Sequence, residues 1–145
     1  MPGVSLRKCC AVVLLGVAML LTGFAHAQDP RASAAQGAAR QFLALTDRGD
    51  AKASWQSAGK QFQNGITSVR WAIALDKVRT PVGEVVDRAL LSTEFLRTFP
   101  GAASEGDYVI VQYRTSFAKL TGARESLTLE READGAWRII GYVIR

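Results

Sequence analysis

The sequence predicts an α+β fold in which N-terminal helices pack on one face of a four-stranded antiparallel sheet. Apolar residues recur at helical spacing in the first half of the chain, up to Pro81. After Gly83 the pattern changes to the two-residue period of strands, and glycine-containing turns separate the strands by short connections. Helices followed by neighbouring antiparallel strands favour a structure in which the helices are segregated to one sheet face.

The N-terminus has the layout of a secretory signal peptide. Two basic residues precede a short apolar run from Cys9 to Leu21, and Ala25-His26-Ala27 gives a small-x-small cleavage site. The run is shorter than the roughly 20 residues that span a bilayer, so an uncleaved membrane anchor is the weaker interpretation. We expect a signal peptide over residues 1–27, a single α+β domain over residues 28–145, no membrane span after cleavage, and a periplasmic or secreted location.

Cleavage after Ala27 would remove both cysteines, both methionines and the single histidine. Disulfides are then excluded, so a hydrophobic core must stabilise the domain. Nucleophilic sites that depend on histidine or cysteine are excluded as well, together with the usual zinc and copper ligand sets. The formal net charge is +5, but the arginines are scattered singly, which predicts no nucleic-acid partner.

Capping residues define the first two predicted helices. Asp29 can accept hydrogen bonds from free N–H groups at a helix start, and the missing N–H of Pro30 costs nothing in the first turn. Gly49 ends this helix, and Asp50 caps a short second helix that carries Trp55. The next stretch, residues 57–64, is weakly patterned and no helix is predicted there.

A third helix is predicted to begin after Thr67. With Thr67 as the cap, Ile66 and Trp71 have the spacing of a hydrophobic staple. Pro81 and Gly83 end this helix.

The first two strands differ in regularity. Residues 85–99 alternate irregularly, which a β-bulge would explain, whereas residues 107–117 alternate cleanly. One face of the second strand is the predicted core face and carries Val109, Val111, Tyr113, Thr115 and Phe117. The other face carries Tyr108, Ile110, Gln112 and Arg114.

The chain ends in a predicted β-hairpin with its turn at Asp134-Gly135. A three-residue turn with Gly135 left-handed pairs Glu130 with Arg138, whereas a two-residue turn would place Arg131 opposite Arg138. Like charges across a ladder are unfavourable, so we predict the three-residue form. This register places Trp137, Ile139, Gly141 and Val143 beside Leu127 and Leu129, and it leaves Ile140, Tyr142 and Ile144 on the outer face.

The chain also resembles the small exported bacterial proteins of the domain-of-unknown-function family 4019, over roughly Ala34 to Ile144. The resemblance rests on the order and spacing of Ser54-Trp55, Trp71, the run from Arg79 to Gly83 followed by Arg88, the run from Tyr113 to Phe117, Glu125, and the run from Asp134 to Tyr142. The chain departs from the family pattern at Val143. The family implies no activity. The layout is also similar to the nuclear-transport-factor-2-like cone, which implies a curved sheet and an interior where some members catalyse and others only bind.

Three polar residues are the candidates for a site, namely Arg88, Tyr113 and Glu125. They could line a cavity that binds an anionic or hydroxylated ligand, or Tyr113 and Glu125 could act in acid–base catalysis. The favoured interpretation is structural, because a buried Arg–Glu pair with a tyrosine hydroxyl is a common way to satisfy polar groups in a small core. Glu130, Glu132 and Asp134 lack the spacing of a calcium loop and indicate a solvated strand edge instead. No metal and no cofactor are predicted.

The outer sheet face gives a second hypothesis. Its predicted apolar patch consists of Tyr108, Ile110, Ile140, Tyr142 and Ile144. Such a patch suggests a homodimer through the sheet, and the alternative is that a loop covers it.

These observations favour a non-enzymatic exported binding or interaction module. The alternative is a small cavity enzyme, a hydrolase or isomerase, that uses carboxylate and tyrosine without histidine, cysteine or metal. An enzyme would require a closed cavity that holds an acid of raised pKa, whereas a module would have a filled cone and an exposed apolar face.

Overall fold

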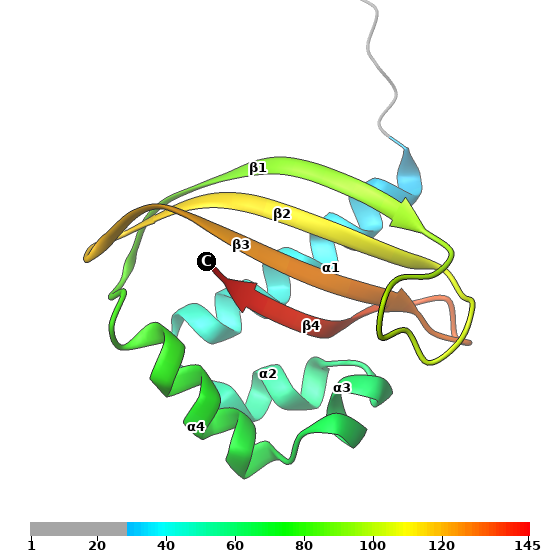
Figure 1. Cartoon of the computed structure of the whole chain (residues 1–145), viewed down its shortest axis with the longest axis horizontal. Helices are drawn as coiled ribbons and strands as arrows, with labels where there is room; N and C mark the ends of the chain where they lie inside the picture. Colours follow the sequence, from blue (N-terminus) through cyan, green and yellow to red (C-terminus); the bar gives the residue numbers. More distant parts are fainter. Residues whose placement is uncertain (1–28) are drawn as a thin grey trace, which may run out of the picture.

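The computed structural model describes residues 29–145, and its helices all precede its strands (Figure 1). The helices are α1 (Pro30–Asp47), α2 (Ala51–Ser57), α3 (Lys60–Gly65) and α4 (Ser68–Arg79). The strands are β1 (Val85–Leu96), β2 (Tyr108–Phe117), β3 (Leu120–Arg131) and β4 (Trp137–Ile144). The strands form one antiparallel sheet in the order β1-β2-β3-β4, which curves over the helices, so the predicted cone-like α+β fold is confirmed. The predicted signal peptide lies outside the described residues.

The predicted caps begin three of the helices. The side chains of Asp29, Asp50 and Thr67 accept backbone N–H groups at the starts of α1, α2 and α4. No helix was predicted over Lys60–Gly65, because α3 depends on distant contacts: the Glu132 carboxylate accepts the Lys60 N–H at 2.8 Å, across 72 residues of sequence. The sequence around α3 therefore contains no strong start signal of its own.

The two predicted strand patterns are confirmed. Register shifts between Val85 and Asp87 and between Leu90 and Ser92 show that bulges interrupt β1. The predicted core face of β2 is buried along its whole length. The bulges explain the irregular alternation of β1, since each extra residue shifts the following side chains to the opposite face.

The last hairpin has the predicted turn but a different second half. Glu130 lies opposite Arg138, and Gly135 has a φ of 83°, as the three-residue turn requires. Beyond the turn, Leu129 pairs with Ile139 and Thr128 pairs with Gly141, so Ile140 is an extra residue in β4. This bulge reverses the faces of everything that follows it.

The prediction for the end of β4 is therefore wrong. Tyr142 lies opposite Leu127, and Ile144 lies opposite Glu125, on the side of the sheet that faces the helices. Val143, which was predicted to be in the core, is 44% exposed. One extra residue in the strand accounts for all three differences.

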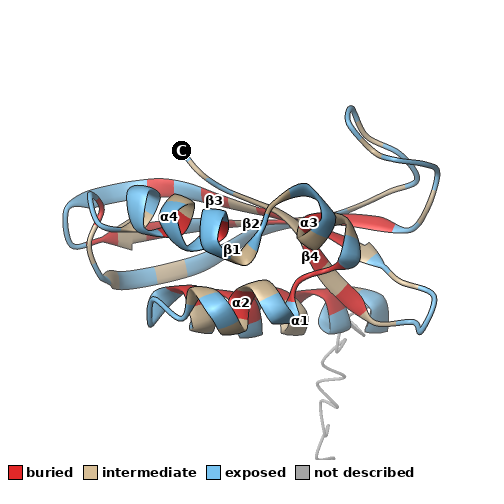
Figure 2. Ribbon diagram, turned by 90° about the horizontal axis from the view of Figure 1, so that it is seen from below, coloured by how far each residue is buried: buried red, intermediate tan, exposed pale blue. Residues whose placement is uncertain are grey.

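Aromatic side chains occupy the interior between the helices and the sheet, where the facing sides of both layers are buried (Figure 2). The rings of Phe42, Phe62, Trp71 and Tyr142 contact one another with centroids 5.0–6.4 Å apart. The Trp71 indole N–H donates to Ser54 Oγ at 2.9 Å, so this buried donor has a hydrogen-bond partner. These rings fill the part of the interior that lies between α1, α3, α4 and β4.

The outer face of the sheet does not carry the predicted apolar patch. Tyr108 is 1% exposed, its hydroxyl donates to the Ser104 carbonyl, and its ring contacts Phe99, so the connection after β1 covers it. Ile110 and Ile140 are half-buried, and the other two members of the predicted patch face the helices. The homodimer stays a prediction.

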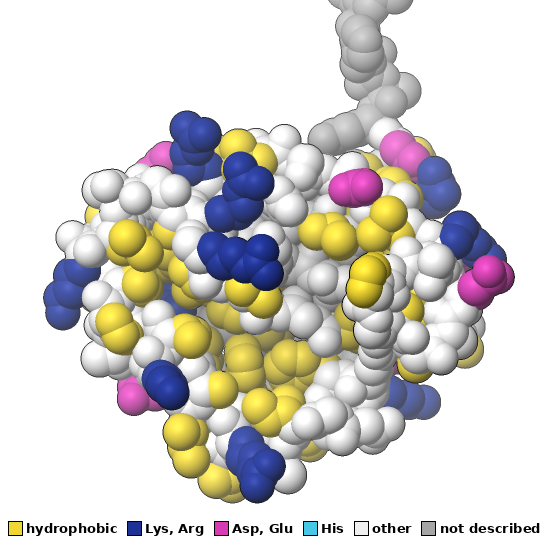
Figure 3. All heavy atoms as spheres, in the orientation of Figure 1, with side chains coloured by type: hydrophobic (Ala, Val, Ile, Leu, Met, Phe, Trp, Pro, Cys, Tyr) yellow, Lys and Arg dark blue, Asp and Glu magenta, His cyan; other side chains and the backbone are white. Residues whose placement is uncertain are grey.

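The surface has hydrophobic side chains elsewhere. Val69 and Ile73 on α4 are 71% and 64% exposed and lie one turn apart. Figure 3 shows a hollow on one face of the molecule whose visible side chains are mainly hydrophobic, with Lys and Arg side chains around it. None of the helices within residues 29–145 is long and apolar enough to cross a membrane.

Candidate functional site

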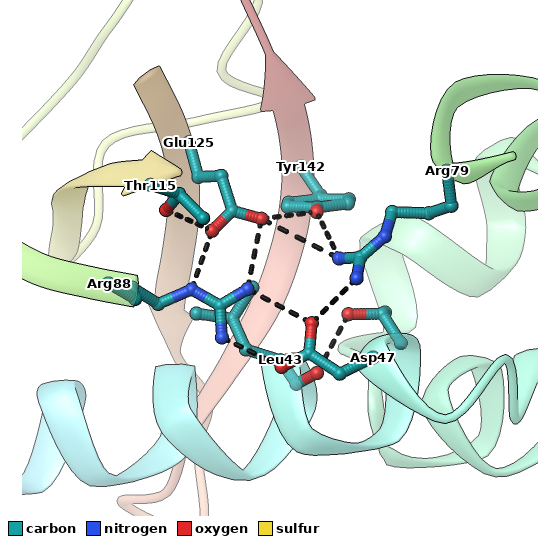
Figure 4. A network of polar contacts seen from close by, with 8 residues as sticks. Leu43, Asp47, Arg79, Arg88, Thr115, Glu125 and Tyr142 are labelled. Carbon is teal, nitrogen blue, oxygen red and sulfur yellow. Dashed lines mark hydrogen bonds and ion pairs between the residues drawn. The ribbon is translucent and has the colours of Figure 1, made fainter. Parts of the chain in front are cut away.

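A buried carboxylate, Glu125 on β3, is the centre of a polar network (Figure 4). Its Oε2 atom accepts from Arg88 Nε and from Thr115 Oγ1, both at 2.6 Å. Its Oε1 atom accepts from the Tyr142 hydroxyl at 2.7 Å and from Arg88 Nη2 at 3.2 Å. Each carboxylate oxygen thus has two hydrogen-bond donors.

A second carboxylate, Asp47 at the end of α1, completes the network. Arg88 donates to both of its oxygens, at 2.8 and 3.0 Å. Arg79, the last residue of α4, forms an ion pair with Asp47 at 2.9 Å and donates to the Tyr142 hydroxyl at 3.3 Å. It also lies 3.7 Å from Glu125. Two guanidinium groups therefore balance two carboxylates.

The network joins six of the eight elements, since each of its side chains comes from a different helix or strand. These side chains are Asp47 from α1, Arg79 from α4, Arg88 from β1, Thr115 from β2, Glu125 from β3 and Tyr142 from β4. The strand pairing explains part of this convergence. Thr115 lies opposite Arg88 on β1, and it is the next residue on the same face of β2 after Tyr113, which lies opposite Glu125. The network thus fixes the ends of two helices to the sheet.

The pKa shifts follow from burial and from these partners. Burial alone would raise the pKa of Asp47, but the hydrogen bonds and charge of Arg88, together with Arg79, lower it below its usual value. For Tyr142, burial is the largest cause of a raised pKa, and the adjacent Glu125 carboxylate raises it further. Burial disfavours the charged form of Arg88 and by itself would lower its pKa, but the hydrogen bonds and charges of Asp47 and Glu125 raise that pKa overall. Both arginines and Asp47 are therefore charged at neutral pH, and Tyr142 is protonated.

The structure brings two of the three candidate residues together. Arg88 and Glu125 are in direct contact, but Tyr113 is not part of the network. Its hydroxyl is buried and has no hydrogen-bond partner within the described residues, and burial raises its pKa. The tyrosine that contacts Glu125 is Tyr142, which the bulge at Ile140 turns inward.

Sequence reasoning missed four members of the network. Arg79 belongs to a run that carries the family resemblance, and this was a usable signal. Thr115 was assigned to the correct face of β2 without a role. No sequence signal pointed to Asp47, because an acidic residue at the end of a helix is usually exposed to solvent. Tyr142 was predicted on the opposite face of β4.

An open cleft of about 280 Å³ adjoins the network between the ends of α1 and α4. The side chains that line it include Thr46, Asp47, Leu75, Asp76, Arg79 and Glu84. Asp47 and Arg79 are the two network residues that also face this cleft. Within residues 29–145, no group of three or more His, Cys, Asp or Glu side chains is placed to hold a metal ion.

The fold and the site define a class: an α+β cone whose interior contains aromatic side chains and a charge-balanced network. The family described as "Protein of unknown function (DUF4019)" has a model that matches residues 38–142, so the chain belongs to this family. The resemblance inferred from the sequence motifs is confirmed.

The solved structures that match include a ketosteroid isomerase-like protein from Erwinia carotovora atroseptica. It has 19% sequence identity and a TM-score of 0.46, over 81% of this chain and 96% of that chain. No curated protein matches the sequence.

Proposed function

We propose that the protein is a non-enzymatic binding or interaction module that acts through its surface. The observation that carries the proposal is the state of Glu125, whose two oxygens each accept two hydrogen bonds and whose side chain has no exposed surface. A general base needs a lone pair within reach of a substrate proton. The Glu125 carboxylate is instead fully used by the protein itself.

The second candidate for acid–base chemistry is Tyr142. Because its pKa lies above the ordinary 10.0, its hydroxyl keeps its proton at neutral pH and donates a hydrogen bond to Glu125. A catalytic acid works best when its pKa is near the working pH, and burial moves Tyr142 away from that range. The states of Glu125 and Tyr142 therefore support a binding module over the alternative enzyme hypothesis.

Exposed apolar side chains support the binding of a partner at the surface of the protein. A module should have a filled interior and exposed apolar residues, and Val69 and Ile73 supply such residues on α4 rather than on the sheet. We retain an exported location, periplasmic or secreted, as part of the proposal. It is supported by the N-terminal leader, with its basic residues, apolar run and Ala25-His26-Ala27.

Mapping a small-molecule fragment library by NMR on the ¹⁵N-labelled protein tests the proposal. We expect chemical-shift changes at surface residues such as Val69 and Ile73, with none that centre on Glu125 and Tyr142. A panel of ester and enolisable ketone substrates should show no turnover above that of buffer. Fragments that displace the Tyr142–Glu125 hydrogen bond, or turnover that Glu125→Gln abolishes in a folded protein, would instead support the enzyme hypothesis.

A further inference from the structure

A small cavity of about 120 Å³ lies at the opposite end of the strands from the Glu125 network. The residues that matter for its chemistry are Arg31, Phe95, Arg97, Asp107, Arg131 and Trp137. Its volume equals that of about four water molecules, which is room for a single compact group and not for a long chain. The cavity therefore suits a small ligand or the end of a larger one.

Aromatic rings form one side of the cavity. The Phe95 and Trp137 rings contact each other with centroids 5.8 Å apart, and the Arg31 guanidinium lies 4.7 Å over the Phe95 ring. Trp137 is 8% exposed. The Trp137 indole N–H makes no hydrogen bond within residues 29–145 and is not completely buried. Two aromatic rings and a guanidinium stacked on one of them thus form an apolar wall of this cavity.

Three arginines surround these rings, and they differ in their partners. Arg31 forms an ion pair with Asp29, and Arg97 forms one with Asp107. No carboxylate of the described residues lies within ion-pair distance of Arg131, whose side chain makes one hydrogen bond, at 3.3 Å to the Gly135 carbonyl. The cavity therefore has an excess positive charge, and Arg131 carries it.

Arg131 and Trp137 are paired across the β3–β4 ladder, so their side chains leave the same face of the sheet. A guanidinium group binds a carboxylate through parallel N–H donors, and a ring packs against Phe95 and Trp137. We propose that this cavity binds an aromatic carboxylate, with the carboxylate on Arg131 and the ring against the two aromatic side chains. This inference rests on the proposed function, for which it names one surface site and its ligand class.

Titration of the ¹⁵N-labelled protein with benzoate, followed at the Trp137 indole signal, tests the inference. Benzamide has nearly the same shape without the charge and serves as the matched ligand. We expect a saturable shift with benzoate and at least about tenfold weaker binding of benzamide, because a charge-assisted hydrogen bond is lost. Arg131→Gln should weaken benzoate binding by about tenfold as well. Arg124→Gln, on the same strand but outside the cavity, should leave it unchanged.

Arg131 is exposed, so its replacement should leave the fold intact, and a circular-dichroism spectrum and melting temperature verify this. Arg131→Lys keeps the charge without the planar donor pair and should bind benzoate with intermediate affinity. Equal binding of benzoate and benzamide would overturn the inference, as would equal affinities of Arg131→Gln and Arg124→Gln. If fragments bind elsewhere on the surface while the Trp137 signal is silent, the site inference fails and the surface-binding proposal stands. Fragments that enter the interior contradict the proposal itself.

Discussion

Replacement of Glu125 by glutamine should destabilise the protein strongly. The side chain keeps its size but loses its charge, and one of its oxygens becomes an NH₂ group that can only donate. Both original oxygens accept from Arg88, and each also accepts from a hydroxyl. The amide would therefore point a donor at other donors and leave two half-buried arginines with only Asp47 as a counter-charge.

The magnitude follows from the burial of the pair. Breaking a buried ion pair by removal of one partner costs about 3–5 kcal/mol, because a charge is left without compensation. Glu125 has no exposed surface, and the side chain of Arg88 is 16% exposed, so a value toward the lower end of this range is expected. For a domain of this length, about 3 kcal/mol corresponds to a fall in melting temperature of roughly 12 °C.

Urea unfolding followed by tryptophan fluorescence measures this difference. Glu94→Gln is the matched control, because Glu94 is exposed on β1 and its side chain makes no hydrogen bond within the described residues. The control should change the unfolding free energy by less than about 0.5 kcal/mol. If Glu125→Gln is as stable as the control, the network does not stabilise the fold and the reasoning is refuted.

Three further substitutions test the same structure. Asp47→Asn should be less stable than the wild type at neutral pH. Because folding lowers the pKa of Asp47, this difference in stability should shrink as the pH falls below about 4. Urea unfolding at several pH values measures the difference. Tyr142→Phe should cost about 1–3 kcal/mol at neutral pH. Because folding raises the pKa of the Tyr142 hydroxyl, this group stabilises the wild type fully at pH values below its ordinary pKa of 10.0. The stabilisation is lost as the pH rises through the pKa of the folded state. The stability difference between wild type and Tyr142→Phe should therefore narrow in unfolding experiments at alkaline pH. Ser54→Ala should cost about 1–3 kcal/mol in thermal unfolding, because the buried Trp71 indole loses its acceptor; an unchanged melting temperature would contradict that hydrogen bond.

The parts of the fold that could be predicted depend on local chemistry. The Asp29, Asp50 and Thr67 caps act within one turn of their own helices, and the core face of β2 follows from the two-residue period. The register of the last hairpin next to its turn followed from one charge pair, Glu130 and Arg138.

The parts that could not be predicted depend on distant contacts or on a single inserted residue. Helix α3 is capped by Glu132, which lies far along the chain. The bulge at Ile140 was hidden because both faces of β4 carry apolar residues, so the alternation looks the same in either register. The bulge also decides which tyrosine reaches Glu125, and for this reason the candidate site was correct in Arg88 and Glu125 but contained Tyr113 in place of Tyr142.

The proposed function depends most on a filled interior, because a hollow cone would restore an internal site. Apolar cavities that stay dry bind xenon or benzene, so these probes report directly on an empty interior. We predict that methyl signals of Leu43, Leu127 and Leu129, each at most 1% exposed, show no saturable shift under xenon pressure. A saturable shift at these methyl groups would show a hollow cone and contradict the proposed function.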